Sequence, residues 1–351
     1  MTENSMIDIR LLENTGNDEI RDYLFCNRNT LIYSEPRFLD LISNQLNAKA
    51  GWIEARRDGQ IVGLLPYLSR GGPLGLVYNS LAYYGSNGGV IQSNKNEVVK
   101  KLLTQTFYQH AMETGAASAT LVTNPLEGDA NFYEIHTGWS HRDERIGQIT
   151  HFPSVSDGED LFDYFQSPRP RNIRRAIKEG VIVEKGGAEA IDFLFKTHSD
   201  NMSAIGGFAK KRSFFENISD HLDCKDWAIY TATLNEKPIA ALLLFYFNET
   251  VEYFTPVVVA EFRNTQALSL IIYSAMEEAR ETGYKNWNWG GTWLTQDGVY
   301  DFKKRWGTSE YRYYYFTKVF NNEILNSSKK FLQEEYFGFF TVPYKYCKTE
   351  G

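Results

Sequence analysis

Residues 287–293 and 302–307 are the stretch from which the rest of the chain is best understood: Trp287-Asn288-Trp289-Gly290-Gly291-Thr292-Trp293 and Phe302-Lys303-Lys304-Arg305-Trp306-Gly307. The alternating aromatic start predicts the end of a β-strand, and the glycine pair lets backbone come close to another group. A strand that opens into a glycine loop and a cationic turn is a common ligand site in α/β proteins. The pattern also fits a strand, a loop and a surface helix whose tryptophans serve the core.

The length and net charge of the chain limit the number of domains and the kinds of partner that we expect. The chain has 351 residues, which predicts two domains at roughly 100–200 residues each. Aromatic residues make up 15% of the chain and favour strand-rich structure. The net charge is −7, from 37 basic and 44 acidic residues. A field of that sign does not attract nucleic acid, so we expect no DNA partner, and any polyanion must meet a local basic patch.

Cysteine usage and hydropathy predict a cytoplasmic protein without a metal. Cys26, Cys224 and Cys347 are far apart, and no Cys/His spacing is typical of zinc or of a disulfide framework. Residues 1–5 lack the basic and apolar regions of a signal peptide. No apolar run approaches the ~18 residues of a membrane helix, so no transmembrane segment is expected.

Four sequence matches indicate an internal repeat. Residues 37–46 match 213–222, and Trp52 matches Trp227. Further along, 61–65 match 239–243 and 111–115 match 279–283. The order is the same and the offset drifts little, so we expect two copies of one α/β unit, residues 1–160 and 161–351. Each copy would contain helices, a hairpin, a strand, a long helix and a strand; helices are expected at 36–46, 98–113, 188–203, 213–222, 266–281 and 327–340.

Residues 167–180 form the only dense cationic run in the chain. Arg171, Arg174 and Arg175 lie within about one helical turn, and Arg171 and Arg175 share a face. Arginine suits bidentate phosphate binding, so a diphosphate on a nucleotide-activated sugar or a lipid carrier is a plausible partner. A solvated linker between domains is an alternative, and RNA is a third, although no RNA-binding motif is present.

Three segments resemble a known family: the Arg-rich run at 171–181, the strand Val251-Glu252-Tyr253-Phe254, and Phe302-Lys303 with Trp306-Gly307. Together with the doubled order, they resemble the Gcn5-related N-acetyltransferase (GNAT) fold as it occurs in tandem in the Fem aminoacyltransferases. Those enzymes add amino acids to the peptide of peptidoglycan precursors. The resemblance implies an α/β (α+β) fold of two GNAT-like domains, each a mixed, mostly antiparallel twisted sheet flanked by helices.

The resemblance also implies a function. It predicts transfer of an aminoacyl or acyl group to an amine of a phosphate-bearing cell-envelope precursor, with transient contact to a membrane surface allowed. Lys303 and Phe302 would be catalytic, and the substrate would contact Arg171, Arg174, Arg175, Tyr253, Trp289, Gly290 and Gly291. The first copy has no glycine pair and no Phe-Lys at residues 121–125, which places the expected active site in the second copy.

The acyl donor stays open between aminoacyl-tRNA and acyl-coenzyme A, with no tightly bound cofactor expected. The helical arm by which some Fem proteins engage tRNA has no counterpart at 201–217. The GNAT pyrophosphate loop, Arg/Gln-x-x-Gly-x-Gly/Ala, is present only as residues 263–267, where Gln266 replaces the central glycine and adds a Cβ. Arg263, Asn264 and Gln266 are the candidate donor-binding residues. Alternatives are an acyl-coenzyme A N-acyltransferase acting on an amino sugar or other small metabolite, and a non-catalytic tandem binding module.

Acyl transfer to an amine requires a neutral amine, donors for the acyl oxygen and a stabilised leaving group. No Ser-His-Asp or Cys-His arrangement stands out, and direct attack on an activated ester needs none. We expect Lys303 to stabilise the developing oxyanion or the leaving oxygen; the alternative is a solvated surface lysine. His198 and His221 are expected to be structural or solvated.

Overall fold

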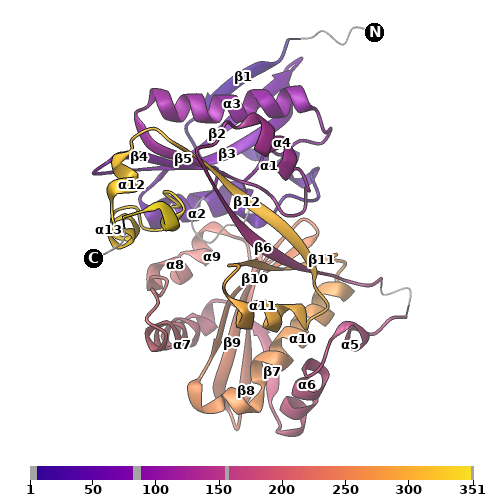
Figure 1. Ribbon diagram of the computed structural model, residues 1–351. Coiled ribbons are helices and arrows are strands. Elements are labelled where there is room, and N and C mark those ends of the chain that lie inside the picture. Colours follow the sequence, from indigo (N-terminus) through magenta and orange to yellow (C-terminus); the bar gives the residue numbers. More distant parts are fainter. Residues whose placement is uncertain (1–5, 82–87, 155–157, 349–351) are drawn as a thin grey trace. The chain divides into compact units, whose positions relative to one another are not determined.

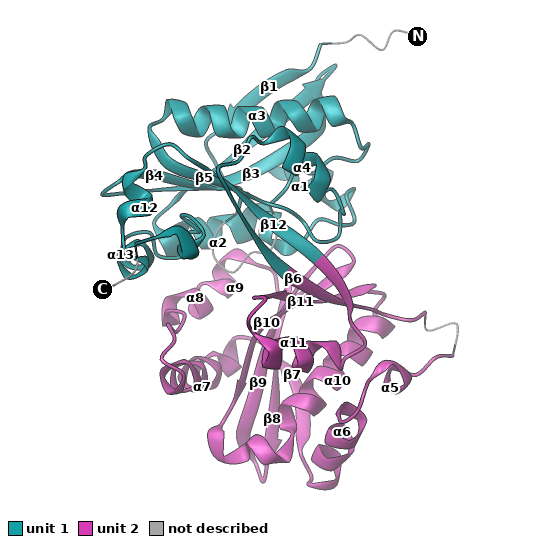
Figure 2. Cartoon of the chain, in the orientation of Figure 1, with its two compact units in different colours: residues 1–145, 312–351 teal, residues 146–311 magenta. Residues whose placement is uncertain are grey.

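The computed structural model describes residues 6–81, 88–154 and 158–348, and the chain divides into two compact units (Figure 2). Unit 1 comprises residues 1–145 and 312–351, and unit 2 comprises residues 146–311. This division differs from the predicted one at 160 and 161. The strand β12 (Ser309–Val319) follows unit 2 in sequence but pairs antiparallel with β5 (Ala116–Val122) of unit 1, so the carboxyl end of the chain belongs to unit 1.

Unit 1 contains a mixed sheet with the strand order β1-β2-β3-β4-β5-β12. The only parallel pair of these neighbours is β4/β5, which α3 connects; the others are antiparallel. Its elements are β1 (Asp8–Leu12), α1 (Asp18–Phe25), α2 (Pro36–Leu46), β2 (Lys49–Arg57), β3 (Gln60–Gly72), β4 (Gly75–Asn79), α3 (Glu97–Glu113), β5, α4 (Ala130–His136), β12, α12 (Glu323–Asn326) and α13 (Lys329–Glu335) (Figure 1).

Unit 2 repeats this topology with the order β7-β8-β9-β10-β11-β6 and one parallel pair, β10/β11, connected by α10. Its elements are β6 (His141–His151, from Ile146 on), α5 (Leu161–Tyr164), α6 (Arg169–Lys178), β7 (Ile182–Gly186), α7 (Ile191–Ala204), α8 (Arg212–Glu216), α9 (Ile218–His221), β8 (Trp227–Leu234), β9 (Lys237–Phe247), β10 (Thr250–Val258), α10 (Ala267–Glu281), β11 (Asn286–Thr292) and α11 (Asp297–Lys304). The predicted fold class, with mixed and mostly antiparallel sheets flanked by helices, is confirmed.

Two predicted helices were wrong in extent. The segment 213–222 forms two short helices, α8 and α9, which meet at Asn217. The predicted helix 327–340 is only α13, Lys329–Glu335. Beyond it the chain is held by side-chain contacts instead, because the Tyr336 hydroxyl accepts from Leu74 N and donates to Gly75 O, at 3.0 Å each.

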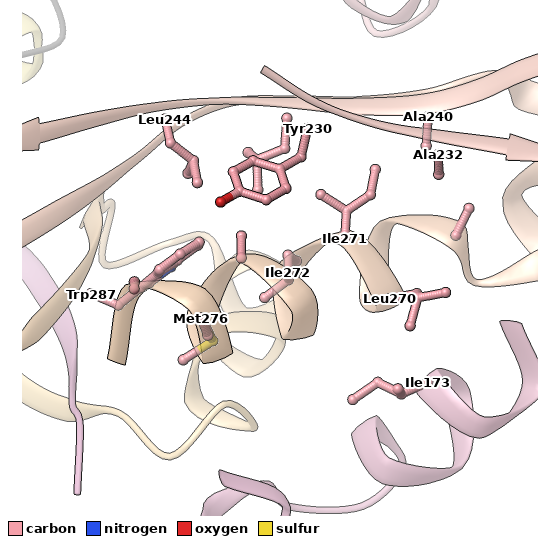
Figure 3. Packing of buried hydrophobic residues seen from close by; sticks show 14 of the residues in the cluster. Ile173, Tyr230, Ala232, Ala240, Leu244, Leu270, Ile271, Ile272, Met276 and Trp287 are labelled. Atoms are coloured by element: carbon pink, nitrogen blue, oxygen red, sulfur yellow. The ribbon is translucent and has the colours of Figure 1, made fainter. Parts of the chain in front are cut away.

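Packing of α10 against the sheet forms the core of unit 2 (Figure 3). Ile271 with Ala275, and Ile272 with Met276, lie four residues apart and form with Leu270 a buried apolar face. That face packs on side chains of β8 and β9 and on Trp287, and Ile173 brings α6 into the same core. The core therefore fixes α6, α10 and β11 relative to one another. Across residues 6–81, 88–154 and 158–348, no helix has the length and apolar character needed to cross a membrane.

Candidate active site

The parallel strands β10 and β11 pair over only three positions. Thr250–Glu252 pair with Asn286–Asn288. Just beyond that point the register of β10 against β9 shifts, and so does the register of β11 against β6. Gly290 follows there with a φ of 69°, a conformation that glycine adopts without steric cost. Its N–H donates to Asn288 Oδ1 at 2.9 Å, and Asn288 Nδ2 donates to the buried Glu252 at 3.1 Å. Two neighbouring strands thus separate at the predicted glycine pair.

Lys303 is buried against this glycine turn. It lies in the last turn of α11, and only 6% of it is exposed. Its Nζ donates to the carbonyls of Gly290 and Gly291 at 3.3 and 3.2 Å and to Thr292 Oγ1 at 3.0 Å. Burial lowers the pKa of Lys303 to about 8. The alternative of a solvated surface lysine is therefore wrong.

Two buried polar residues that sequence reasoning missed support Lys303. Thr292 Oγ1 accepts from Lys303 and donates to Gln148 Oε1 at 3.2 Å. Gln148 Nε2 in turn donates to the Tyr300 carbonyl at 3.1 Å, at the centre of α11. These bonds fix the rotation of α11 against β6 and β11. A single Gln on a strand carries no sequence signal for this role.

An aromatic cluster surrounds the site. The rings of Trp289 and Trp306 are stacked with centroids 5.7 Å apart, and Tyr253 lies 4.9 Å from Trp289. Phe302 contacts both tryptophans. Trp289 and Trp306 are almost fully buried, so the tryptophans do serve the core, as one interpretation of the motif held. Half-buried Tyr253 keeps its proton because burial raises its pKa well above the ordinary value.

The basic run contributes a different arginine from those predicted. Arg171, Arg174 and Arg175 are exposed; Arg174 lies over the Phe162 ring and Arg175 pairs with Glu179 at 2.7 Å. None of the three hydrogen-bonds to Lys303, Phe302 or Tyr253 among the described residues. Their role in binding substrate stays a prediction.

Arg169, at the first position of α6, is instead buried beside the site. Its guanidinium lies 4.3 Å from the centre of the Phe302 ring, and its Nη2 donates to the Phe302 carbonyl at 3.3 Å. Helical spacing was the sequence signal for this burial, because it places residue 169 on the same face of α6 as the buried Ile173 and Ala176.

The candidate donor loop precedes α10. Arg263 and Asn264 are exposed, and Gln266 adopts φ 62° and ψ 25°, the left-handed conformation. Its Nε2 donates to the Arg263 carbonyl at 3.1 Å. Gln266 thus takes the backbone conformation that favours glycine, and the structure does not bring these side chains into hydrogen-bond contact with Lys303 within the described part of the chain.

The predicted histidines are structural in their contacts. His198 is buried and its Nε2 accepts from Lys210 N at 3.0 Å, and burial together with Lys210 lowers its pKa to about 4. His221 Nδ1 is paired with the Asn217 carbonyl at 2.8 Å. Among the residues that the structure describes, no group of His, Cys, Asp and Glu side chains is arranged as a metal site.

Comparison with known proteins agrees with this fold. Residues 169–304 match the family model for the acetyltransferase (GNAT) domain. A crystal structure of FemX superposes with a TM-score of 0.71 at 17% identity, over 90% of this chain and 98% of that chain. A tandem GNAT protein from the clavulanic acid biosynthesis pathway gives 0.54 at 13%, over 89% and 98%. L-PGS from Bacillus licheniformis gives 0.54 at 12%, over 89% and 94%. No curated protein matches in sequence.

The class is therefore an acyltransferase that carries a GNAT domain in unit 2 and has a tandem GNAT fold. Within that class, the chain resembles FemX in fold over nearly its whole length. The predictions of an enzyme, of a tandem GNAT architecture and of a Fem-like fold are confirmed.

Proposed function

We propose that the protein is a Fem-like transferase that moves an aminoacyl or acyl group onto an amine of a phosphate-bearing cell-envelope precursor. One observation carries the proposal: a buried lysine ammonium, Lys303, is held at the point where β10 and β11 separate. The fold similarity to FemX supports this acceptor class. Because aminoacyl-tRNA and acyl-coenzyme A are both cytoplasmic, the proposal includes a cytoplasmic location.

In the proposed reaction the neutral amine attacks the acyl carbon, a tetrahedral oxyanion forms, and the bond to the ester oxygen or thioester sulfur then breaks. The proton lost by the amine passes to solvent or to the leaving group. The Lys303 contacts to Gly290 and Gly291 are long for N–H···O bonds, so a negative oxygen can replace one of them. A fixed cation at a developing oxyanion is an effective form of catalysis in a site with little water.

The proposal makes Lys303 active in its protonated form, and this sets the pH dependence. Since burial lowers its pKa to about 8, the ammonium is lost as the pH rises through that value. We expect the ratio of the wild-type rate to the Lys303→Met rate to fall between pH 7 and pH 9, because titration of the acceptor amine cancels in the ratio. Initial rates of both enzymes across this range test it; a ratio that rises with pH would show that neutral Lys303 acts as a base.

Acyl-coenzyme A as donor is the second candidate, and the left-handed backbone of Gln266 favours it. We expect Gln266→Gly to increase the free energy of unfolding by about 0.5 kcal/mol, because glycine adopts this conformation without a Cβ. If coenzyme A binds this loop, its affinity should also rise. Glu236→Gly is a matched control, since Glu236 has φ 63° in the β8–β9 turn and should gain stability without any change in affinity.

A donor screen tests the proposal as a whole. The protein would be incubated with charged tRNA or with coenzyme A thioesters, together with UDP-linked sugar peptides, and the products weighed by mass spectrometry. Acylation of an amine on the precursor supports the Fem-like function. Acylation of free amino sugars from a coenzyme A thioester, with the precursors unchanged, would favour the second candidate.

A further inference from the structure

Arg169 is a buried cation whose electrostatic environment is incomplete. Only 7% of the residue is exposed, and its guanidinium lies 4.3 Å from the centre of the Phe302 ring and 5.4 Å from that of the Trp306 ring. Phe302 directly precedes Lys303 in α11, so Arg169 contacts the residue next to the buried lysine. Arg305 adds a third positive charge close by, and its field contributes to lowering the pKa of Arg169.

No carboxylate balances Arg169 among the described residues. Its side chain donates one hydrogen bond there, from Nη2 to the Phe302 carbonyl at 3.3 Å. Its Nε is buried without an acceptor, and so is the neighbouring Trp306 Nε1. Two buried N–H groups at this place thus have no acceptor among the described residues.

An uncompensated buried charge is expensive. Burial lowers the pKa of Arg169 to about 10, which reflects the loss of hydration. Aromatic contacts return only part of the hydration free energy that an unpaired buried ion loses. Buried charges in proteins are usually paired, so an arrangement of this kind indicates a partner that arrives with a ligand.

We propose that Arg169 anchors an anionic oxygen group, a phosphate or a carboxylate, on the molecule that reacts beside Lys303. The proposal rests on the proposed function and names the substrate chemistry of the same site. The Nε–H of the guanidinium has no acceptor, and arginine binds two oxygens of one phosphate or carboxylate group through an edge of its guanidinium. The group would belong either to the donor, as a phosphate of coenzyme A or of the tRNA end, or to the acceptor, as its diphosphate.

Pyrophosphate is the first probe, with the shift in melting temperature as the measurement. Wild type should be stabilised, because a ligand that binds only the folded state raises its stability. Arg169→Met should lose the shift, and Arg169→Lys should need at least tenfold more pyrophosphate, since lysine keeps the charge without the guanidinium. Lys178→Met, an exposed change on the same helix, should respond like wild type.

The contrary result is equally clear. If Arg169→Met and Arg169→Lys keep the wild-type response, or if wild type shows none, the anchor is absent. Loss of the response in Arg174→Met alone would place the anion on the exposed face of α6 and overturn the proposal. Neither measurement uses turnover, so failure of the proposed function would not imitate either outcome.

Calorimetry then separates the two sources. Coenzyme A and a UDP-sugar would be titrated into wild type and Arg169→Lys. An affinity loss of at least tenfold for coenzyme A alone assigns the anchor to the donor, and a loss for the UDP-sugar alone assigns it to the acceptor. If wild type and Arg169→Lys bind each of these ligands with equal affinity, the proposal is contradicted.

Discussion

Replacing Lys303 with methionine is expected to lower kcat/KM by about 10²–10³-fold, the usual effect of removing one donor to an oxyanion. Methionine has a similar length and fills the buried space without the ammonium. Its effect on stability is the balance of two opposing terms: the lost bonds to Gly290, Gly291 and Thr292, and the relieved cost of burying a charge. We therefore expect the Tm to change by no more than about 4 °C.

The matched control is Lys304→Met, because Lys304 is the next residue, is exposed and lies over the Tyr300 ring instead of the glycine turn. Its kcat/KM should stay within about twofold of wild type, as expected for a solvated side chain. Steady-state rates and thermal melts of the three proteins decide the question. A Lys303→Met protein that melts like wild type and is fully active would remove Lys303 from the mechanism.

Trp306→Ala is expected to have the largest effect on stability. Trp306 is fully buried, stacks on Trp289, meets Phe165 edge-on at 5.0 Å and accepts at its carbonyl from Thr150 Oγ1 at 3.0 Å. Truncating such a side chain costs about 3–5 kcal/mol. For a unit of this size the loss corresponds to a decrease in Tm of about 10 °C.

Trp306→Phe controls for the aromatic contact. It keeps a ring against Trp289 and should lose about half as much free energy as the alanine variant, since less volume is removed. Denaturant unfolding of both variants measures the difference. A Trp306→Ala protein as stable as wild type would mean that this ring is not part of the core of unit 2.

Much of the fold was predictable from local patterns. The Asp58-Gly59 turn has positive φ at both residues and joins β2 to β3, and Asp-Gly is a strong sequence signal for such a hairpin turn. The repeated order of hairpin, strand and helix predicted two equivalent sheets. The pairing of β12 with β5 of unit 1, and of β6 with β11 of unit 2, was not predictable. A sequence repeat shows which segments are alike and does not show which unit each strand pairs with.

The candidate site was predictable only where residues adjoin in sequence. Lys303, Gly290 and Gly291 were selected together, and the structure brings them into contact. Arg169 was missed because its neighbours in the basic run carry the same charge. Which arginine is buried depends on which face of α6 packs against the core, and the charge pattern does not show this. Gln148 was missed because its role depends on the pairing of β6 with β11.

Single-turnover transfer is the most direct test of the central claim, that unit 2 transfers an acyl group to an amine beside the Lys303 ammonium. Excess enzyme would be mixed with a limiting amount of the donor and acceptor identified by the screen, and the acylated amine followed by mass spectrometry. Wild type is predicted to form the amide, with Lys303→Met at least about 100-fold slower in this chemical step. Equal single-turnover rates for the two proteins would contradict the account.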